Sequence, residues 1–184
     1  MPASLSQTPR WWADETIGPE SLASSSVTTA KIAANAITSA KLDVGTIQTA
    51  EVSVTNAQIK ALRATPKTLV AAPGASKVIE FVSAIIILKA GANVLTESTA
   101  NLAVKYTDGS GTQISETVES TGFIDQATDT LTTVRVKQDG IVATAQFANS
   151  PLVLHNLGAG EFAGNAAADA TLRVKVAYRI WPTT

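Results

Sequence analysis

The single histidine of the chain, His155, is the residue type most often used for acid–base chemistry near neutral pH. It lies in the apolar run Leu152–Asn156, and the sequence contains no cysteine that could act as a nucleophile or a thiolate ligand. No serine or acidic residue stands at the spacing of a known catalytic triad, and a histidine metal site needs further ligands that the sequence does not offer. We therefore interpret His155 as a structural histidine in a strand.

Paired carboxylates could share a proton or bind a cation, and the candidate pairs are Asp14/Glu15, Glu116/Glu119 and Asp125/Asp129. None belongs to an Asp-x-Asp-x-Asp-Gly calcium loop, so we interpret them as solvated surface acids. The glycines from Gly158 to Gly164 resemble a dinucleotide-binding loop, but their spacing is G-x-G-x-x-x-G and no acidic residue ends a second strand further on. A surface loop explains this segment better. The sequence thus predicts a protein that is not an enzyme and that binds no cofactor or metal.

Basic residues alternate with other residues in several candidate strands and could form one stripe across a sheet: Lys105, Arg135, Lys137, Arg173, Lys175 and Arg179. We favour a solvated face balanced by Thr and Glu; the alternative is contact with an acidic protein surface or a glycan. The chain has 14 Lys+Arg against 15 Asp+Glu, and Tyr106 and Tyr178 point away from the bases, so nucleic-acid binding is not expected. The longest apolar run, Phe81–Leu88, is far shorter than the roughly 20 residues of a membrane helix.

The first third of the chain, which must position any N-terminal binding residues, contains an internal repeat. Blocks of ten residues from Val27 read VTTAKIAANA, ITSAKLDVGT and IQTAEVSVTN. Large aliphatic residues recur at every fifth position, and they are Ile17, Leu22, Val27, Ile32, Ile37, Leu42, Ile47 and Val52. On an α-helix these anchors would spiral around the axis, and in a flat strand they would alternate between faces.

Two architectures satisfy a period of five. One is a four-sided solenoid with a corner in every pentad, although the pentads would give only about two coils and solenoids usually need three or more repeats. The other is an extended arm that cannot bury its anchors alone and meets copies of itself around a symmetry axis. We favour the second, so the eight anchors are predicted trimer contacts.

The blocks VTTAKIAANAITSAKL resemble the short A-I/V-T-T-A-K-L/I repeats of bacteriophage tail-fibre and head-decoration proteins. The resemblance covers about residues 17 to 62 and implies a slender homotrimer in a phage particle. This chain departs from the commoner Ala-Asp-Gly form of the repeat, with Ala34-Asn35-Ala36 and Asp43-Val44-Gly45.

Before the repeat lies the segment Arg10-Trp11-Trp12. The tryptophans either pack on the arm of their own chain or form an aromatic anchor that docks into another protein, because Trp and Arg dominate interface hot spots. Both interpretations stay open. If the tryptophans dock into another protein, Arg10, Trp11 and Trp12 form a partner-binding segment.

Beyond Ala64-Thr65-Pro66 the pattern changes to short strands separated by Gly, Pro, Asn and Asp. The predicted strands are Lys67–Ala72, Lys77–Lys89, Asn101–Thr107, Gln113–Val118, Leu131–Lys137, Pro151–Asn156 and Thr171–Trp181. The segment Asp108-Gly109-Ser110-Gly111 indicates a hairpin turn. The run Phe81–Leu88 is apolar enough to be covered on both faces of its sheet. A short helix is possible at Ser120–Asp125. The strands predict an antiparallel β-sandwich or jelly roll that should fold when the chain begins near Thr65.

The sequence therefore predicts a mainly β protein with an N-terminal anchor segment (1–16), an extended repeat-bearing arm (17–64) and a head domain (65–184). Three segments of the head domain also resemble head domains of phage structural proteins, namely Leu69–Gly74, Lys77–Val82 and Leu152–Asn156. We expect a homotrimeric capsid decoration or cement protein of the virion, made in the host cytoplasm and bound to a capsid or tail protein. The alternatives are a tail fibre and a receptor- or glycan-binding module.

Overall fold

The structure is a computed structural model that describes residues 45–97, 101–138 and 147–184. Most of the predicted arm and anchor residues lie outside the described residues, namely Arg10, Trp11, Trp12, Ile17, Leu22, Val27, Ile32, Ile37 and Leu42. The fold below is that of the β domain alone, which begins near Asp43.

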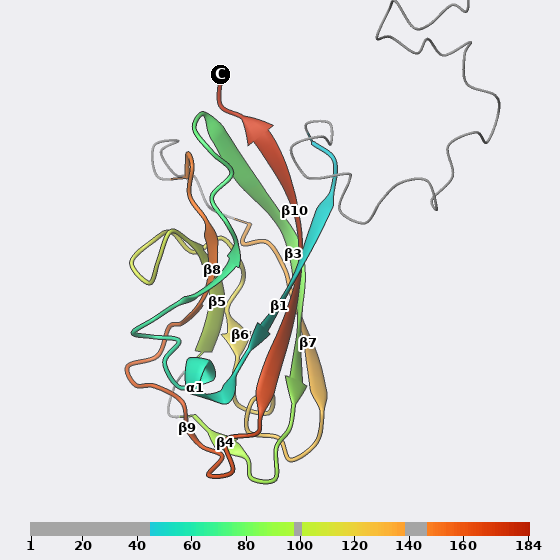
Figure 1. Ribbon diagram of the computed structural model, residues 1–184, viewed down its shortest axis with the longest axis vertical. Coiled ribbons are helices and arrows are strands. Elements are labelled where there is room, and N and C mark those ends of the chain that lie inside the picture. Colours follow the sequence, from blue (N-terminus) through green and yellow to red (C-terminus); the bar gives the residue numbers. More distant parts are fainter. Residues whose placement is uncertain (1–44, 98–100, 139–146) are drawn as a thin grey trace, which may run out of the picture. The chain divides into compact units, whose positions relative to one another are not determined.

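Two antiparallel four-stranded sheets form the domain. Sheet A has the order β1 (Gln48–Val54), β10 (Thr171–Pro182), β3 (Lys77–Lys89) and β7 (Thr130–Val134). Sheet B has the order β2 (Lys67–Val70), β8 (Leu152–Asn156), β5 (Asn101–Tyr106) and β6 (Val118–Glu119). A two-stranded ribbon of β4 (Leu95–Thr96) and β9 (Ala163–Gly164) and one helix, α1 (Asn56–Ile59), lie at one end (Figure 1). The prediction of a mainly β, sandwich-like domain is confirmed.

The pairings between strands are nested along the chain. Strand β1 pairs with β10, β2 with β8, β3 with β7 and β5 with β6, all antiparallel. Pairing of β10 with β3 and of β8 with β5 completes the two sheets. The first strand thus pairs with the last, and in the sequence each pair is enclosed by the two strands of the pair before it.

Most of the predicted strands are present, because period-two alternation and turn residues mark them locally. β3 spans the predicted range, and β2, β5, β7, β8 and β10 differ from theirs only at the ends. Gln113–Val118 is less regular than predicted, with isolated bridges at Gln113 and Ser115 before β6. Ser120–Asp125 is a turn and not a helix, closed by hydrogen bonds from Phe123 and Ile124 to the Ser120 carbonyl.

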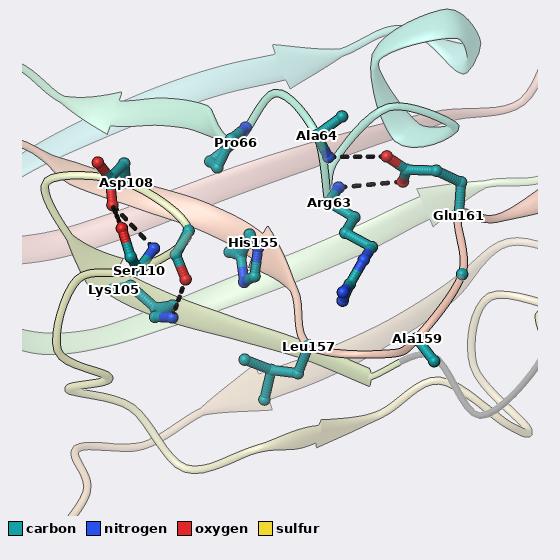
Figure 2. Close-up of a pocket in the computed structure, with 12 residues that line it drawn as sticks. Arg63, Ala64, Pro66, Lys105, Asp108, Ser110, His155, Leu157, Ala159 and Glu161 are labelled. Carbon is teal, nitrogen blue, oxygen red and sulfur yellow. Dashed lines mark hydrogen bonds between the residues drawn. The ribbon is translucent and has the colours of Figure 1, made fainter.

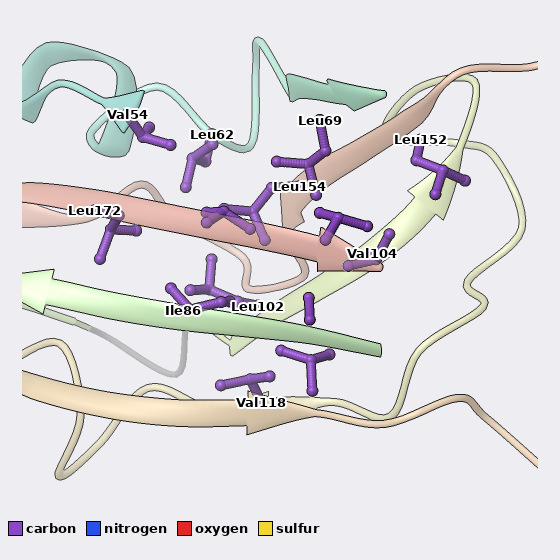
Figure 3. Close-up of a cluster of buried hydrophobic side chains, with 14 of the residues drawn as sticks. Val54, Leu62, Leu69, Ile86, Leu102, Val104, Val118, Leu152, Leu154 and Leu172 are labelled. Atoms are coloured by element: carbon purple, nitrogen blue, oxygen red, sulfur yellow. The ribbon is translucent and has the colours of Figure 1, made fainter. Parts of the chain in front are cut away.

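The core lies between the two sheets, where the inner faces of the long strands meet (Figure 3). Leu172, Val174 and Val176 of β10 are buried, while Arg173 and Lys175 between them are exposed, as the alternation predicts. Ile86 of β3 and Leu154 of β8 are fully buried and come from opposite sheets. Burial of this apolar area is the main stabilising contribution to such a fold.

The prediction that Phe81–Leu88 is covered on both faces is wrong. Ile86 and Leu88 are buried on the inner face, but Ile85 is 38% exposed on the outer face of sheet A. The described part of the chain puts no further layer over this face, so β3 follows the ordinary one-sided pattern of an antiparallel sandwich. A bulge between Ala177 and Tyr178 shifts the register of β10 against β3 further along.

The fold also includes residues that the sequence analysis assigned to the arm. Strand β1 pairs with β10 along its whole length, from Gln48↔Tyr178 to Val54↔Leu172. Val54, Ile59 and Leu62 are completely buried in the core. A capping box closes the start of α1, because Thr55 accepts from the Gln58 backbone and the Gln58 side chain accepts from Thr55. The β domain therefore starts before residue 65.

A buried amide network fixes α1 to the rest of the domain. The Asn56 side chain donates to Asn165 Oδ1 at 2.7 Å, and Asn165 Nδ2 donates to the Asp169 carboxylate at 2.9 Å. Asp169 in turn accepts from the backbone of Ala92 at 2.9 Å. Three segments that are distant in sequence are thus joined by hydrogen bonds that satisfy buried polar groups.

Candidate functional site

A hollow of about 950 Å³ opens on the outer face of sheet B and brings together six charged or polar side chains of the domain. Its polar lining is Arg63, Lys105, Asp108, Ser110, His155 and Glu161 (Figure 2). We call it the sheet-B hollow. Its remaining lining is small or aliphatic, including Ala64, Pro66 and Leu157.

Strand pairing places two of these side chains on one face. His155 of β8 pairs with Ala103 of β5, and Lys105 lies two residues further along β5, so both residues are on the outer face. His155 is nevertheless only 7% exposed, because the connections at residues 60–66 and 107–112 cover this face. A Cβ atom on Gly109 would lie 2.6 Å from His155 Nε2, so the glycine permits this close approach.

The turn after β5 forms one wall of the hollow. Asp108 Oδ1 accepts from the Ser110 hydroxyl at 2.7 Å, from the Ser110 N–H at 2.8 Å and from the Gly111 N–H at 3.1 Å. These hydrogen bonds, that of the Ser110 hydroxyl above all, lower the pKa of Asp108. The Lys105 ammonium donates to the Gly109 carbonyl. The chain then reverses direction and runs back beside β5. The Tyr106 N–H donates to the Thr112 carbonyl across this turn, which confirms the predicted hairpin.

The opposite wall joins the turn after α1 to the loop after β8. The Glu161 carboxylate accepts from the backbone N–H groups of Arg63 at 3.0 Å and Ala64 at 2.8 Å. The Arg63 guanidinium donates to the Gly158 carbonyl. Asn156 holds the loop from within, with Gly158 N–H donating to Oδ1 at 2.8 Å and Nδ2 donating to the Gly160 carbonyl at 2.9 Å.

Burial and nearby positive charge hold the pKa of the His155 imidazole below its ordinary value. Burial lowers its pKa most, the positive charge of Lys105 lowers it further, and the Arg63 backbone beside the ring acts in the opposite direction. Burial also lowers the pKa of Lys105, against the attraction of Asp108. His155 Nδ1 is buried and has no hydrogen-bond partner among the described residues.

The described residues separate the side chains that the sequence analysis grouped together. The predicted basic stripe does not lie on one sheet, because Lys105 belongs to sheet B whereas Arg173, Lys175 and Arg179 belong to β10 of sheet A. On β10 the cations are balanced as expected: Arg173 and Lys175 pair with Glu51, and Arg179 with Glu80.

Two of the predicted trimer anchors lie in the described part of the chain. Ile47, just before β1, is 52% exposed. Val52, on β1, is partly buried and packs against the core. The repeat pattern therefore continues into β1, and its last anchor, Val52, packs against the core of the β domain of its own chain.

Sequence reasoning missed the gathering of Arg63, Glu161 and His155. His155 was singled out and interpreted as structural, and its burial agrees with that, but its ring also lines the hollow. Arg63 and Glu161 are 98 residues apart and carry no local signal that would join them. Gly158–Gly160 belongs to a loop, as the sequence analysis expects, whereas Gly164 at the end of that segment belongs to β9.

Among the described residues, no group of three or more His, Cys, Asp or Glu side chains could hold a metal ion. In the same ranges, no helix is long and apolar enough to cross a membrane. No family model matches this chain, and no curated protein sequence matches it.

Proposed function

We propose that the chain is a structural component of a bacteriophage particle, a homotrimeric capsid decoration or cement protein attached through its N-terminal arm. The observation that carries the proposal is the run of aliphatic anchors at every fifth residue, which leads directly into β1 of the domain. Such anchors are too sparse to bury one another within a single extended chain, and association of copies removes them from water.

The strand order supports a jelly-roll head. In a jelly roll, a long antiparallel hairpin is rolled up so that its nested strand pairs fall into two packed sheets. The pairs β1–β10, β2–β8, β3–β7 and β5–β6 have this nesting. Jelly rolls are common in viral capsid proteins, although the same architecture serves lectins, so the fold alone does not choose the function.

The β1 edge of sheet A, which has no further strand beside it among the described residues, gives further support to assembly. β1 is the edge strand that continues the repeat, and Ile47 beside it exposes half of its surface. An aliphatic side chain at this position is suited to contact a neighbouring copy. In this proposal the protein does no catalysis, needs no cofactor, and works in the virion after synthesis in the host cytoplasm.

A receptor- or glycan-binding module, such as a tail fibre carries, is the second candidate. The sheet-B hollow favours it, since it brings charged and hydroxyl-bearing side chains to an open surface. In this alternative the arm still trimerises, but the head recognises a ligand outside the particle.

The test of the first proposal uses the full chain. Light scattering should give three times the 19.0 kDa of one chain, and the protein should co-sediment with phage particles stripped of their decoration protein. Binding to intact host cells without binding to particles would favour the second candidate. A stable monomer at micromolar concentration would contradict both trimeric proposals.

A further inference from the structure

The carboxylates of the sheet-B hollow already form several hydrogen bonds within the protein, whereas its cations form few. Both Glu161 oxygens accept backbone N–H groups, and Asp108 Oδ1 accepts three hydrogen bonds from its own turn. The two acids are therefore largely occupied in holding the walls of the hollow.

The two cations are held differently. Arg63 and Lys105 each donate to a backbone carbonyl, of Gly158 and of Gly109, and neither forms an ion pair with a carboxylate in the described part of the chain. A guanidinium has five N–H donors and an ammonium has three, so each keeps donors in reserve. A carbonyl fixes their direction without neutralising their charge.

His155 lies between these two cations in Figure 2, and both charges act on its ring. The imidazole is more than nine-tenths buried, and its Nδ1 atom has no hydrogen-bond partner among the described residues. The acids of the hollow act on these groups without pairing with them, Asp108 on Lys105 and Glu161 on the His155 ring, so both cations keep N–H donors for an anionic ligand.

From this arrangement we propose that the sheet-B hollow is a binding site for an oxyanion, a carboxylate or phosphate group on a small hydrophilic molecule. Arg63 and Lys105 supply charge-assisted hydrogen bonds to the anionic oxygens. Ser110 and Asp108 line the same hollow and are placed to contact hydroxyl groups of the same molecule. Among the described residues, no Phe, Tyr or Trp side chain lines the hollow, which argues against recognition by stacking on the face of a neutral sugar. This inference does not rest on the particle-attachment function, which uses the arm.

The test titrates the full-length protein with sodium glucuronate, inorganic phosphate and, as the uncharged comparison, glucose. Two-dimensional amide NMR should show saturable shifts at Arg63, Gly109 and His155 with at least one of the two anions. Saturation with glucuronate alone identifies a planar carboxylate as the preferred group, and saturation with phosphate alone a tetrahedral one. Absence of saturable shifts with both anions, or equal affinity for glucose and glucuronate, would overturn the proposal.

Variants locate the site. Arg63→Gln and Lys105→Gln should each weaken anion binding about tenfold or more, because each removes a charge-assisted hydrogen bond. Lys77→Gln and Arg135→Gln remove the same charge from residues that do not line the hollow, and should leave the affinity unchanged. Equal weakening by all four variants would show a general charge effect and reject the site. Particle co-sedimentation should persist in Arg63→Gln and Lys105→Gln, which separates this result from the fate of the proposed function.

Discussion

At the scale of single residues, the close approach of Gly109 to His155 decides whether the sheet-B hollow can keep its shape. At this point the turn at residues 107–111 lies directly against the imidazole of His155 from β8, and Gly109 has no side chain that would keep them apart. Buried rings in such places have little freedom to move away from an added methyl group.

Gly109→Ala should therefore destabilise the domain by about 1–3 kcal/mol, the usual cost of overpacking. The added Cβ would lie 2.6 Å from His155 Nε2 and must displace the ring or the turn. Urea unfolding measures the change. The matched control is Gly160→Ala in the same hollow, where a Cβ meets no atom within 4 Å. Equal destabilisation by both variants would contradict this account.

Tyr106 gives the domain a pH dependence in alkaline solution. Its hydroxyl donates to the Ile79 carbonyl, and burial, with a smaller contribution from Glu80, raises its pKa to about 12 from the ordinary 10.0. A raised pKa means that the tyrosine stabilises the fold fully below pH 10 and that this stability is lost as the pH rises toward 12.

Tyr106→Phe should cost about 1 kcal/mol at pH 8, for the lost hydrogen bond, and should lose less stability than the wild type between pH 10 and pH 12. Urea unfolding at pH 8 and at pH 11 measures both effects. Other titrating groups are common to the two proteins and cancel in the comparison. If the two proteins lose the same stability on alkalisation, Tyr106 is not responsible.

At the scale of elements, β1 and α1 matter because they complete sheet A and the core. Their residues Val54, Ile59 and Leu62 are fully buried, and each such side chain contributes about 1.5–3 kcal/mol. The whole stability of a domain is only about 5–15 kcal/mol. This changes the sequence-based expectation that a chain beginning near Thr65 folds by itself.

A chain shortened to begin at Asp43 should keep the β-rich fold, and one that begins at Thr65 should be unfolded or melt far lower. Circular dichroism and thermal melting compare the two. The shorter chain also leaves β10 without its edge partner, which adds an aggregation hazard. Identical melting of the two chains would show that β1 contributes no stability.

At the scale of the whole molecule, the segment Arg10-Trp11-Trp12 and the β domain are expected to act separately. If Trp11 and Trp12 dock into the particle, each should contribute about 2 kcal/mol or more to attachment, as hot-spot aromatics do. They should contribute nothing to the melting of the β domain.

Replacing both Trp11 and Trp12 with Ala should abolish particle attachment and leave the melting temperature and the trimer unchanged. Co-sedimentation and thermal melting measure the two effects. Trp181→Ala is the control, because Trp181 is 40% exposed in the β domain and donates to Glu80 at 2.7 Å. Loss of the trimer with persistent attachment would instead show that the tryptophans pack on their own arm.

The sequence by itself determined most of the strands of the two sheets and, on β10, the side that is buried. Alternation along Leu172–Val176, the apolar run of β3 and the turn at Asp108–Gly111 are local patterns, and local backbone preferences produce the elements they predict. The repeat, with its period of five, is likewise a property of the sequence alone.

Only the tertiary structure decided where the domain begins, which face of β3 stays open and which polar residues meet. Distant segments are joined by three kinds of contact. These are the pairing of β1 with β10, the hydrogen bond between Asn56 and Asn165 across 109 residues, and the hydrogen bonds from Arg63 and Ala64 to Glu161. A local pattern states that a residue is polar or apolar but not which distant partner satisfies it, because the nested pairing of strands sets that partner. The sheet-B hollow exists for the same reason: it forms where two connections cover paired strands, and no single segment contains it.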